Sequence, residues 1–382
     1  MSTGRTADCE IAVIGAGVVG CAVALALARR GATVILMEAE REPALGASGA
    51  NSGILHTGFD SPAGELETQL ILRSAQLRDA ALATLGVSVV RCGAEMRARD
   101  DGEAAAVSAM RAGAQANGVE VRERADGTLE IPGEAVTDPA AYTLAIAHSA
   151  QLHGTQVLTS FRVSAIERTS IGTLLIRSED DAVVSALVAV NCAGLQADAV
   201  ARMVGDDSFE IYPRKGEFLV FDQPTGSQLE RILLPVPTKR TKGVLVFPTG
   251  DGKVITGPTA VDLEDKSDLS VRAEARDEIL PKATAMYAPL EGLQPIAAYA
   301  GLRPAGRGVN YVVGVSGACP RLVNVAAIRS TGLSASLGIA ERVCSIIGSI
   351  GVALRPEREL LAAAPQATAL PWRRRAAERA GR

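Results

Sequence analysis

The sequence has 382 residues, of which 47% are hydrophobic and 21% charged, and its formal net charge is −4. This composition is typical of a globular protein. The length predicts two lobes, because a single hydrophobic core stops growing at roughly 250 to 300 residues. The weak negative charge and the 3% aromatic content argue against a nucleic-acid partner.

Six cysteines are scattered along the chain without a Cys-x-x-Cys pair or a Cys/His cluster. We therefore expect no metal or iron–sulfur site and no disulfide framework, only reduced thiols. The start of the chain is polar, unlike a signal peptide, and no apolar run approaches the roughly 18 residues of a transmembrane helix. These features predict a cytoplasmic protein without a transmembrane segment.

The stretch from Asp8 to Glu38 has the pattern of a strand, a tight glycine turn, a helix and a second strand. The apolar run at 11–14 leads into Gly-Ala-Gly-Val-Val-Gly at 15–20, and Gly31 ends the helical pattern that follows. The second β-rich run ends on an acid 18 residues after the last glycine of the motif. Strand, helix, spacing and terminal acid together predict a dinucleotide-binding unit.

Each part of this unit has a physical role if a dinucleotide lies across it. Gly15 permits the sharp turn, Gly17 lets the backbone approach a pyrophosphate, and Gly20 lets the helix pack closely on the sheet. The helix N-terminus at Val18 offers free N–H groups and the positive end of a dipole. Glu38 would accept hydrogen bonds from a ribose diol, which disfavours the 2′-phosphate of NADP. The alternative is a glycine turn that only packs a helix on a strand.

The rest of the chain alternates between helical and strand patterns. A loop at 41–66 is rich in Gly, Ser and Pro yet apolar at its centre, and loops of this length in compact domains are usually functional or disordered. Its apolar middle favours the functional alternative. Helices are expected at 65–85, 100–118, 137–153 and 330–347. Strands are expected at 87–91, 128–132, 156–158, 163–166, 173–176, 182–190, 211–221 and within 243–259.

The strands after residue 205 alternate strongly and carry turn pairs, which is typical of an antiparallel sheet. The predicted fold is therefore α/β (α+β overall), with a Rossmann-like domain and a second, antiparallel-sheet substrate domain that interleave in the sequence. The first domain is assigned to 8–90, 150–205 and 300–352, the second to 91–149 and 206–299, and a tail to 353–382. Five arginines near the end of the tail could contact anionic lipid, although a solvated end is the commoner situation.

Four separated blocks of the sequence together resemble the FAD-dependent D-amino acid oxidase superfamily. They are the glycine motif through Glu38, the loop at 46–58, VNCAGLQAD at 190–198, and AGLRPA at 300–305 with AAIRSTGLSASLGIA at 326–340. The markers NSGILHTGFD, YPRKGEF, GPTA and IRSTGL are most similar to the branch of flavin-dependent glycerol-3-phosphate dehydrogenases and L-2-hydroxyglutarate oxidases.

This resemblance implies FAD, bound extended across the first domain, with the substrate domain over the flavin. It also implies that a helix N-terminus faces the flavin O2 edge, where negative charge develops. Ala50 departs from the relatives, which carry His or Arg there, so the identity of the substrate stays open. The electron acceptor (oxygen, quinone or protein) and the oligomeric state stay open as well. The implied cofactor-binding residues are Gly15, Gly17, Val18, Val19, Gly20, Glu38, Ala39, Ser48, Asn51, Ser52, Gly53, Ala193, Gly194, Gly332, Leu333 and Ser334.

Oxidation of an alcohol by a flavin needs a base for the hydroxyl proton and an anchor that orients the substrate. His56 lies in the loop expected beside the flavin and is the predicted base, whereas a lone histidine is more often structural. Arg303, in Gly-Leu-Arg-Pro, is the predicted catalytic anchor for a substrate carboxylate or phosphate. Arg329, Lys215 and Lys242 are second choices, and each could instead be a surface ion-pair partner.

The leading hypothesis is an FAD-dependent dehydrogenase or oxidase that takes a hydride from a small anionic 2-hydroxy acid or polyol phosphate to flavin N5. A second hypothesis is an amine or amino acid oxidase of the same superfamily. Such an enzyme should survive the loss of His56 better, because a neutral amine needs no base. A third is a catalytically silent flavoprotein that serves as a partner subunit.

Overall fold

The computed structural model describes residues 6–237, 243–362 and 376–377. The N-terminal motif forms the centre of the first of two main sheets, in which strands β1 and β12 pair in parallel over their length. The apolar stretches of these strands are buried, as expected for parallel strands covered on both faces. The parallel strands, in spatial order, are β20 (Leu322–Ala326), β12 (Val183–Asn191), β1 (Thr6–Ile14), β2 (Val34–Met37) and β9 (Gln156–Leu158). Antiparallel strands extend the sheet: β10 (Val163–Arg168), β11 (Leu174–Ser178) and β19 (Val312–Val315).

Helices pack on this sheet and on one another. Helix α1 (Val18–Arg29) contacts α4 (Pro139–Leu152) and α7 (Gly332–Ser349), and α7 contacts α2 (Leu66–Thr84). Helix α4 begins where its sequence predicts, because Asp138 accepts hydrogen bonds from the N–H groups of the first turn and a proline occupies the first helical position. The short helix α5 (Ala197–Arg202) follows β12.

The second sheet is largely antiparallel, with a single parallel pair between β14 and β5. It combines a short N-terminal set of strands with a longer central set, so its parts come from two separate regions of the chain. The first set is β5 (Ala94–Met96), β6 (Arg122–Glu123) and β7 (Leu129–Ile131). The second set is β13 (Ile211–Asp222), β14 (Ile232–Leu234), β15 (Leu245–Pro248), β16 (Lys253–Gly257), β17 (Val261–Asp262) and β18 (Ala297–Gly306).

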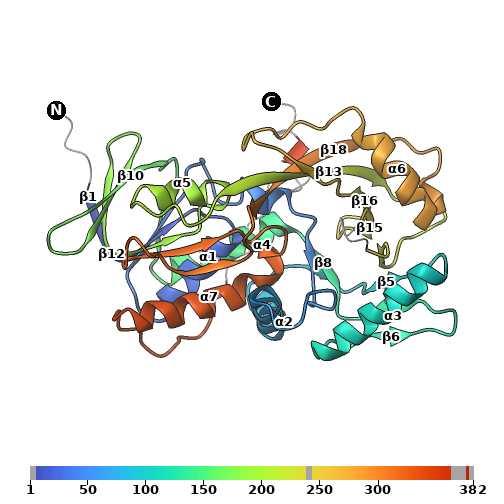
Figure 1. Cartoon of the computed structure of the whole chain (residues 1–382), viewed down its shortest axis with the longest axis horizontal. Helices are drawn as coiled ribbons and strands as arrows, with labels where there is room; N and C mark the ends of the chain where they lie inside the picture. Colours follow the sequence, from blue (N-terminus) through green and yellow to red (C-terminus); the bar gives the residue numbers. More distant parts are fainter. Residues whose placement is uncertain (1–5, 238–242, 363–375, 378–382) are drawn as a thin grey trace.

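Two long strands join the halves of the molecule. Strands β13 and β18 pair antiparallel over ten residues each, from Ile211 opposite Gly306 to Val220 opposite Ala297. In Figure 1 they run from the half that holds β1, β12 and α7 into the half that holds β15, β16 and α6 (Ala275–Met286). Because side chains alternate between the faces of a strand, successive residues of β13 point to opposite sides of this two-stranded ribbon.

A third, small sheet places the long loop after β2. Its order is β3 (Ile54–Leu55), β8 (Ala135–Thr137) and β4 (Val89–Val90). Pairing of β3 with β8 brings the loop beside the segment that connects β7 to β8. Helix α3 (Asp101–Ala116) lies near β5 and β6 in the second half (Figure 1).

The predicted mixed α/β fold, with a parallel Rossmann-like sheet and a second, antiparallel sheet, is confirmed. The predicted helices at 65–85, 100–118, 137–153 and 330–347 all form, within a few residues of the expected ends. The domain boundaries stay a prediction, and α4, which they assign to the substrate domain, packs against α1, a helix that lies on the first sheet. In the part of the chain that the structure describes, no helix is long and apolar enough to cross a membrane.

Candidate active site

A cleft of about 540 Å³ runs along the carboxyl ends of β1, β2 and β12. This is the edge where ligands bind in open parallel sheets, because the N-termini of the following helices point to it. Most of the predicted cofactor-binding residues line this cleft, although they come from five separate segments of the chain. They are Gly15, Gly17, Val18, Val19, Glu38, Ala39, Ser48, Asn51, Ala193, Gly194, Gly332 and Leu333.

The glycine turn leaves no room for side chains between β1 and α1. Gly15 has φ +99°, and a Cβ there would lie 2.5 Å from the carbonyl oxygen of Cys192. A Cβ on Gly20 would lie 1.9 Å from the carbonyl oxygen of Gly15, so this glycine allows the helix to approach the strand. Gly17, the N-cap residue of α1, has no side chain of its own, and the N–H of Val18 donates to the hydroxyl of Ser48 at 2.9 Å. The first turn still presents backbone N–H groups and the positive end of the helix dipole to the cleft.

Glu38 closes the other side of the turn. Its carboxylate accepts hydrogen bonds from the N–H of Ala16 at 2.7 Å and from the N–H of Glu40 at 2.9 Å. Burial raises the pKa of Glu38, and these N–H donors partly oppose the rise. The carboxylate lines the cleft and keeps further lone pairs for a ligand, since each carboxylate oxygen can accept more than one hydrogen bond.

Four predicted cofactor residues lie elsewhere. Gly20 lies behind the turn, and Gly53 lies against the carbonyl oxygen of Thr137, only 2.2 Å from where its Cβ would be. Ser334 is buried, and its hydroxyl accepts from the N–H of His56 and donates to the carbonyl of Ile54. Ser52 lines the neighbouring cavity. The cleft is not lined by Gly20, Gly53 or Ser334. Their close contacts and hydrogen bonds instead fix the backbone around it.

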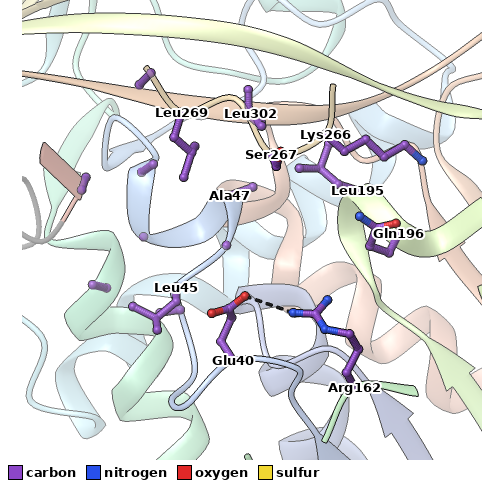
Figure 2. Close-up of a pocket in the computed structure, with 17 residues that line it drawn as sticks. Glu40, Leu45, Ala47, Arg162, Leu195, Gln196, Lys266, Ser267, Leu269 and Leu302 are labelled. Carbon is purple, nitrogen blue, oxygen red and sulfur yellow. Dashed lines mark hydrogen bonds and ion pairs between the residues drawn. The ribbon is translucent and has the colours of Figure 1, made fainter. Parts of the chain in front are cut away.

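A smaller cavity of about 250 Å³ adjoins the cleft (Figure 2). Its lower edge is bridged by Glu40 and Arg162, 3.5 Å apart, and the labelled side chains of Lys266 and Gln196 lie across from them. Glu40, Arg162, Gln196 and Lys266 also line the cleft itself, so this cavity is a side branch of the cofactor cleft.

A second cavity, of about 460 Å³, adjoins the cleft between the two sheets, where the loop after β2 meets β13 and β18. His56, Arg303 and Arg329 all line it, together with Ser330 and Thr331 at the start of α7. Three residues that are up to 273 positions apart in the sequence, His56 and the two arginines, are thus brought to one cavity.

His56 is held by a buried carboxylate that the sequence analysis missed. Its Nδ1 lies 2.9 Å from Oε2 of Glu134, whose side chain is 0% exposed. The other oxygen of Glu134 accepts from the N–H and the hydroxyl of Thr57, at 2.6 and 2.9 Å. Since a carboxylate only accepts, Nδ1 carries a proton, and in the neutral ring Nε2 keeps its lone pair. Among the described residues none hydrogen-bonds Nε2, and the ring is 21% exposed.

The backbone of His56 is fixed as well. Its N–H donates to Ser334 in α7, and its carbonyl accepts from Nη1 of Arg78 in α2 at 2.9 Å. The only sequence signal for Glu134 is an acid inside the apolar run Ile-Pro-Gly-Glu-Ala-Val, where a buried charge needs a partner. That signal identifies a paired acid but does not name its partner.

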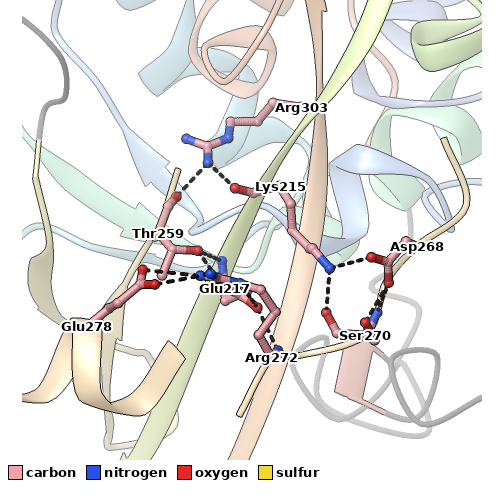
Figure 3. Close-up of polar contacts among 8 residues, drawn as sticks. All are labelled: Lys215, Glu217, Thr259, Asp268, Ser270, Arg272, Glu278 and Arg303. Carbon is pink, nitrogen blue, oxygen red and sulfur yellow. Dashed lines mark hydrogen bonds and ion pairs between the residues drawn. The ribbon is translucent and has the colours of Figure 1, made fainter. Parts of the chain in front are cut away.

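Arg303 is anchored by carbonyl groups rather than by an acid. Its guanidinium donates to the carbonyl oxygens of Arg214 at 3.0 Å, Lys215 at 2.9 Å and Thr259 at 2.7 Å, and Figure 3 shows the last two. A Cβ on Gly216 would lie 2.7 Å from Nη2, so the glycine of Arg-Lys-Gly-Glu makes room for the guanidinium. Burial, with the nearby Arg214, lowers the pKa of Arg303 to about 10, so the group stays charged at neutral pH.

Of the three alternative anchors, Arg329 and Lys215 lie within the described residues, and they differ in position. Arg329 lines the cavity but pairs with Glu67 at 2.7 Å. Lys215 does not line the cavity: its side chain is 1% exposed and its ammonium donates to Asp268 at 2.7 Å and to the carbonyl of Ser270 at 3.1 Å (Figure 3). The geometry thus speaks against Lys215 as a substrate anchor, because it occupies the opposite face of β13 from Gly216. Lys242 lies outside the described residues.

The family model described as DAO, FAD dependent oxidoreductase, matches residues 10–346. The chain belongs to this family. It is 30% identical over 357 residues to the glycerol 3-phosphate dehydrogenase of Caloramator mitchellensis, a match that covers 89% of this chain and 74% of the relative. It is 27% identical over 270 residues to the L-2-hydroxyglutarate dehydrogenase of Escherichia coli K12, covering 66% and 64%.

A solved structure shows the same fold with its cofactor. The L-alpha-glycerophosphate oxidase of Mycoplasma pneumoniae, with FAD bound, superposes with a TM-score of 0.87 at 24% identity and covers 93% of this chain and 97% of that one. The protein is an FAD-dependent oxidoreductase, and the cleft fits that cofactor in chemistry. The α1 N-terminus suits a pyrophosphate and Glu38 suits a ribose diol.

Proposed function

We propose that the protein oxidises the CH–OH group of a small anionic 2-hydroxy acid or polyol phosphate, with His56 as the base and Arg303 as the anchor. The observation that carries the proposal is their common cavity. An imidazole with a free Nε2 and a buried carboxylate on Nδ1 faces the same space as a charged guanidinium without a carboxylate partner among the described residues. The similarity to a glycerol 3-phosphate dehydrogenase and to an L-2-hydroxyglutarate dehydrogenase supports this substrate class.

In this proposal FAD, when bound, accepts the hydride. Arg303 binds the substrate anion and thereby fixes which C–H bond faces the cofactor. Nε2 of His56 takes the hydroxyl proton, and Glu134 stabilises the positive charge that the ring then carries. The N-terminus of α7, at Ser330 and Thr331 beside the same cavity, offers a positive dipole end to negative charge on the cofactor.

The experiment is anaerobic mixing of the FAD-loaded protein with 2-hydroxy acids, polyol phosphates and amino acids, followed by flavin absorbance. Bleaching by a hydroxy acid or polyol phosphate, slowed by His56→Gln, supports the proposal. Bleaching only by amino acids, with His56→Gln near the parent rate, would identify the amine or amino acid oxidase instead. A flavin that no member of the panel bleaches would indicate a silent subunit.

A further inference from the structure

The cavity that holds His56 and Arg303 also restricts what the rest of the substrate can be. We infer that the preferred substrate is a monocarboxylic 2-hydroxy acid with an apolar side chain, rather than a polyol phosphate or a 2-hydroxy dicarboxylate. This inference rests on the proposed function and narrows it. It depends on two independent features of the cavity, its charges and its apolar wall.

The first feature is the number of uncompensated charges. Three arginines line the cavity within the described ranges, and two of them are already paired. Arg214 makes a two-point contact with Asp262, at 2.6 and 2.9 Å, and Arg329 pairs with Glu67 at 2.7 Å. Arg303 donates only to carbonyl oxygens.

Among the described residues of the cavity, one guanidinium lacks a carboxylate partner, and it matches one carboxylate. A phosphate dianion or a second carboxylate would bring a further negative charge into a partly buried space, and such a charge is costly without its own partner. The charges of the described residues therefore favour a monoanion.

The second feature is the apolar wall of the cavity. It is built by strands of the second sheet and by one loop residue, and its side chains are hydrocarbon or thioether: Phe59, Met96, Phe218, Leu234, Leu245 and Phe247. Phe218 is held rigid because its ring stacks on Tyr299 with centroids 4.9 Å apart. The hydroxyl of Thr259, a polar neighbour, is already bonded to Glu217.

A substrate group that reaches this wall gains free energy by leaving water if it is apolar, and loses hydrogen bonds if it is polar. Each methylene buried against the wall should tighten binding by roughly fourfold. A hydroxymethyl or carboxylate group in the same place should weaken binding, because the six described side chains of the wall offer it no donor.

The test measures flavin reduction and binding in the full-length, FAD-loaded protein. The substrates are lactate, 2-hydroxybutanoate and 2-hydroxy-4-methylpentanoate, set against 2-hydroxyglutarate and glycerol 3-phosphate. The ratio of the reduction rate to the half-saturating concentration should rise about fourfold per methylene. It should be roughly 30-fold or more lower for the two polar substrates.

Binding is measured separately with acids that cannot be oxidised. Propanoate, butanoate and 4-methylpentanoate, and glutarate for comparison, are titrated against the visible flavin spectrum and the thermal unfolding midpoint. Dissociation constants should fall along the monocarboxylate series, and glutarate should bind more weakly than 4-methylpentanoate. This readout does not depend on turnover.

A matched pair of variants places a cation in the wall or away from it. With Leu245→Arg, the ratio of the reduction rate to the half-saturating concentration should rise about 10-fold or more for 2-hydroxyglutarate, the effect of a new charged hydrogen bond. The same ratio should fall for 2-hydroxy-4-methylpentanoate. Leu187→Arg, on an exposed position of β12, should change neither. If Leu245→Arg does not fold, the two parent-protein series still decide the question.

The possible outcomes separate the two levels of the argument. Preference of the parent protein for glycerol 3-phosphate or 2-hydroxyglutarate, or flat affinities along the monocarboxylate series, overturns this inference and leaves the proposed function standing. Bleaching by amino acids alone, or by nothing in the panel, overturns the proposed function itself.

Discussion

Replacing Glu134 with glutamine should disable His56 without removing it. The amide oxygen of glutamine can still accept from the N–H and hydroxyl of Thr57, so the buried environment keeps two of its three hydrogen bonds. The amide nitrogen, a donor, would then face Nδ1 of His56. Nδ1 would have to accept, the proton would move to Nε2, and the ring would have no lone pair on the side of the cavity.

The magnitude follows from the contact of 2.9 Å between Nδ1 and Oε2. Unit charges whose centres are roughly 4 Å apart interact by about 4 kcal/mol at an effective dielectric constant near 20. This attraction exists only once the ring has taken the proton, so its loss raises the energy barrier of the reaction. A barrier about 4 kcal/mol higher corresponds to a reduction rate about 10³-fold lower. The range known for general bases, roughly 10² to 10⁴-fold, brackets that value.

The assay is anaerobic stopped-flow reduction of the flavin, with the best hydroxy acid, over a range of substrate concentrations. The limiting rate should fall and the half-saturating concentration should change little, because Glu134 does not line the cavity. Glu134→Asp, which keeps the charge, should recover part of the rate. Glu120→Gln, at an exposed ion pair with Arg122, is the matched control and should behave as the parent.

Coupling between the two residues gives the sharpest check. If Glu134 acts through His56, adding Glu134→Gln to His56→Gln should slow the reaction little beyond the single His56 variant. The reasoning is refuted if Glu134→Gln retains FAD and its fold and reduces its flavin within about threefold of the parent rate. Full additivity of the two substitutions would likewise show that Glu134 acts independently of the ring.

Four further predictions follow from the site and its supports. His56→Gln should keep FAD and slow flavin reduction by an alcohol roughly 10² to 10⁴-fold in the same stopped-flow assay. Glu38→Ala should weaken FAD retention by roughly 10 to 150-fold, measured by ultrafiltration, without changing the reduction rate of the flavin that remains bound. Arg303→Lys should lower both the substrate affinity and the rate of flavin reduction, because an ammonium replaces a planar guanidinium. Arg303→Met should weaken substrate binding by about 2 to 5 kcal/mol and leave the fold intact. The ammonium of Lys215, with help from Ser270, lowers the pKa of Asp268 to about 2. A carboxyl whose pKa is lowered by folding contributes stability above its ordinary value of 3.8, and this contribution is lost as the pH falls toward 2. Asp268→Asn should therefore lower the unfolding temperature at pH 7 and have less effect near pH 3.

Each of these expectations has a result that would contradict it. A near-parent rate for His56→Gln with a hydroxy acid would make the histidine structural, and unchanged FAD retention in Glu38→Ala would mean that the acid serves only the turn. Parent-like kinetics in Arg303→Met would move the anchor to Arg329. An Asp268→Asn variant as stable as the parent at pH 7 would show that the ion pair with Lys215 contributes nothing.

The cofactor half of the molecule could be predicted from the sequence because its signals are local. The turn, the helix and the acid of the first unit all fall within residues 8–38, and the strain at Gly15 and the contact at Gly20 are properties of one connection. Apolar runs and capping residues such as Asp138 likewise predicted the type and approximate ends of most elements. These signals act over a few residues, so no knowledge of distant contacts was needed.

The substrate half was decided by contacts between distant segments. Glu134 is 78 residues from His56, and only the pairing of β3 with β8 brings them together. Lys215 and Gly216 are neighbours in sequence, yet the alternation of β13 sends the lysine to Asp268 and leaves the glycine beneath Arg303. A strand pattern shows that adjacent residues face opposite sides, but which side holds the cavity depends on what packs there, and that is a property of the tertiary structure.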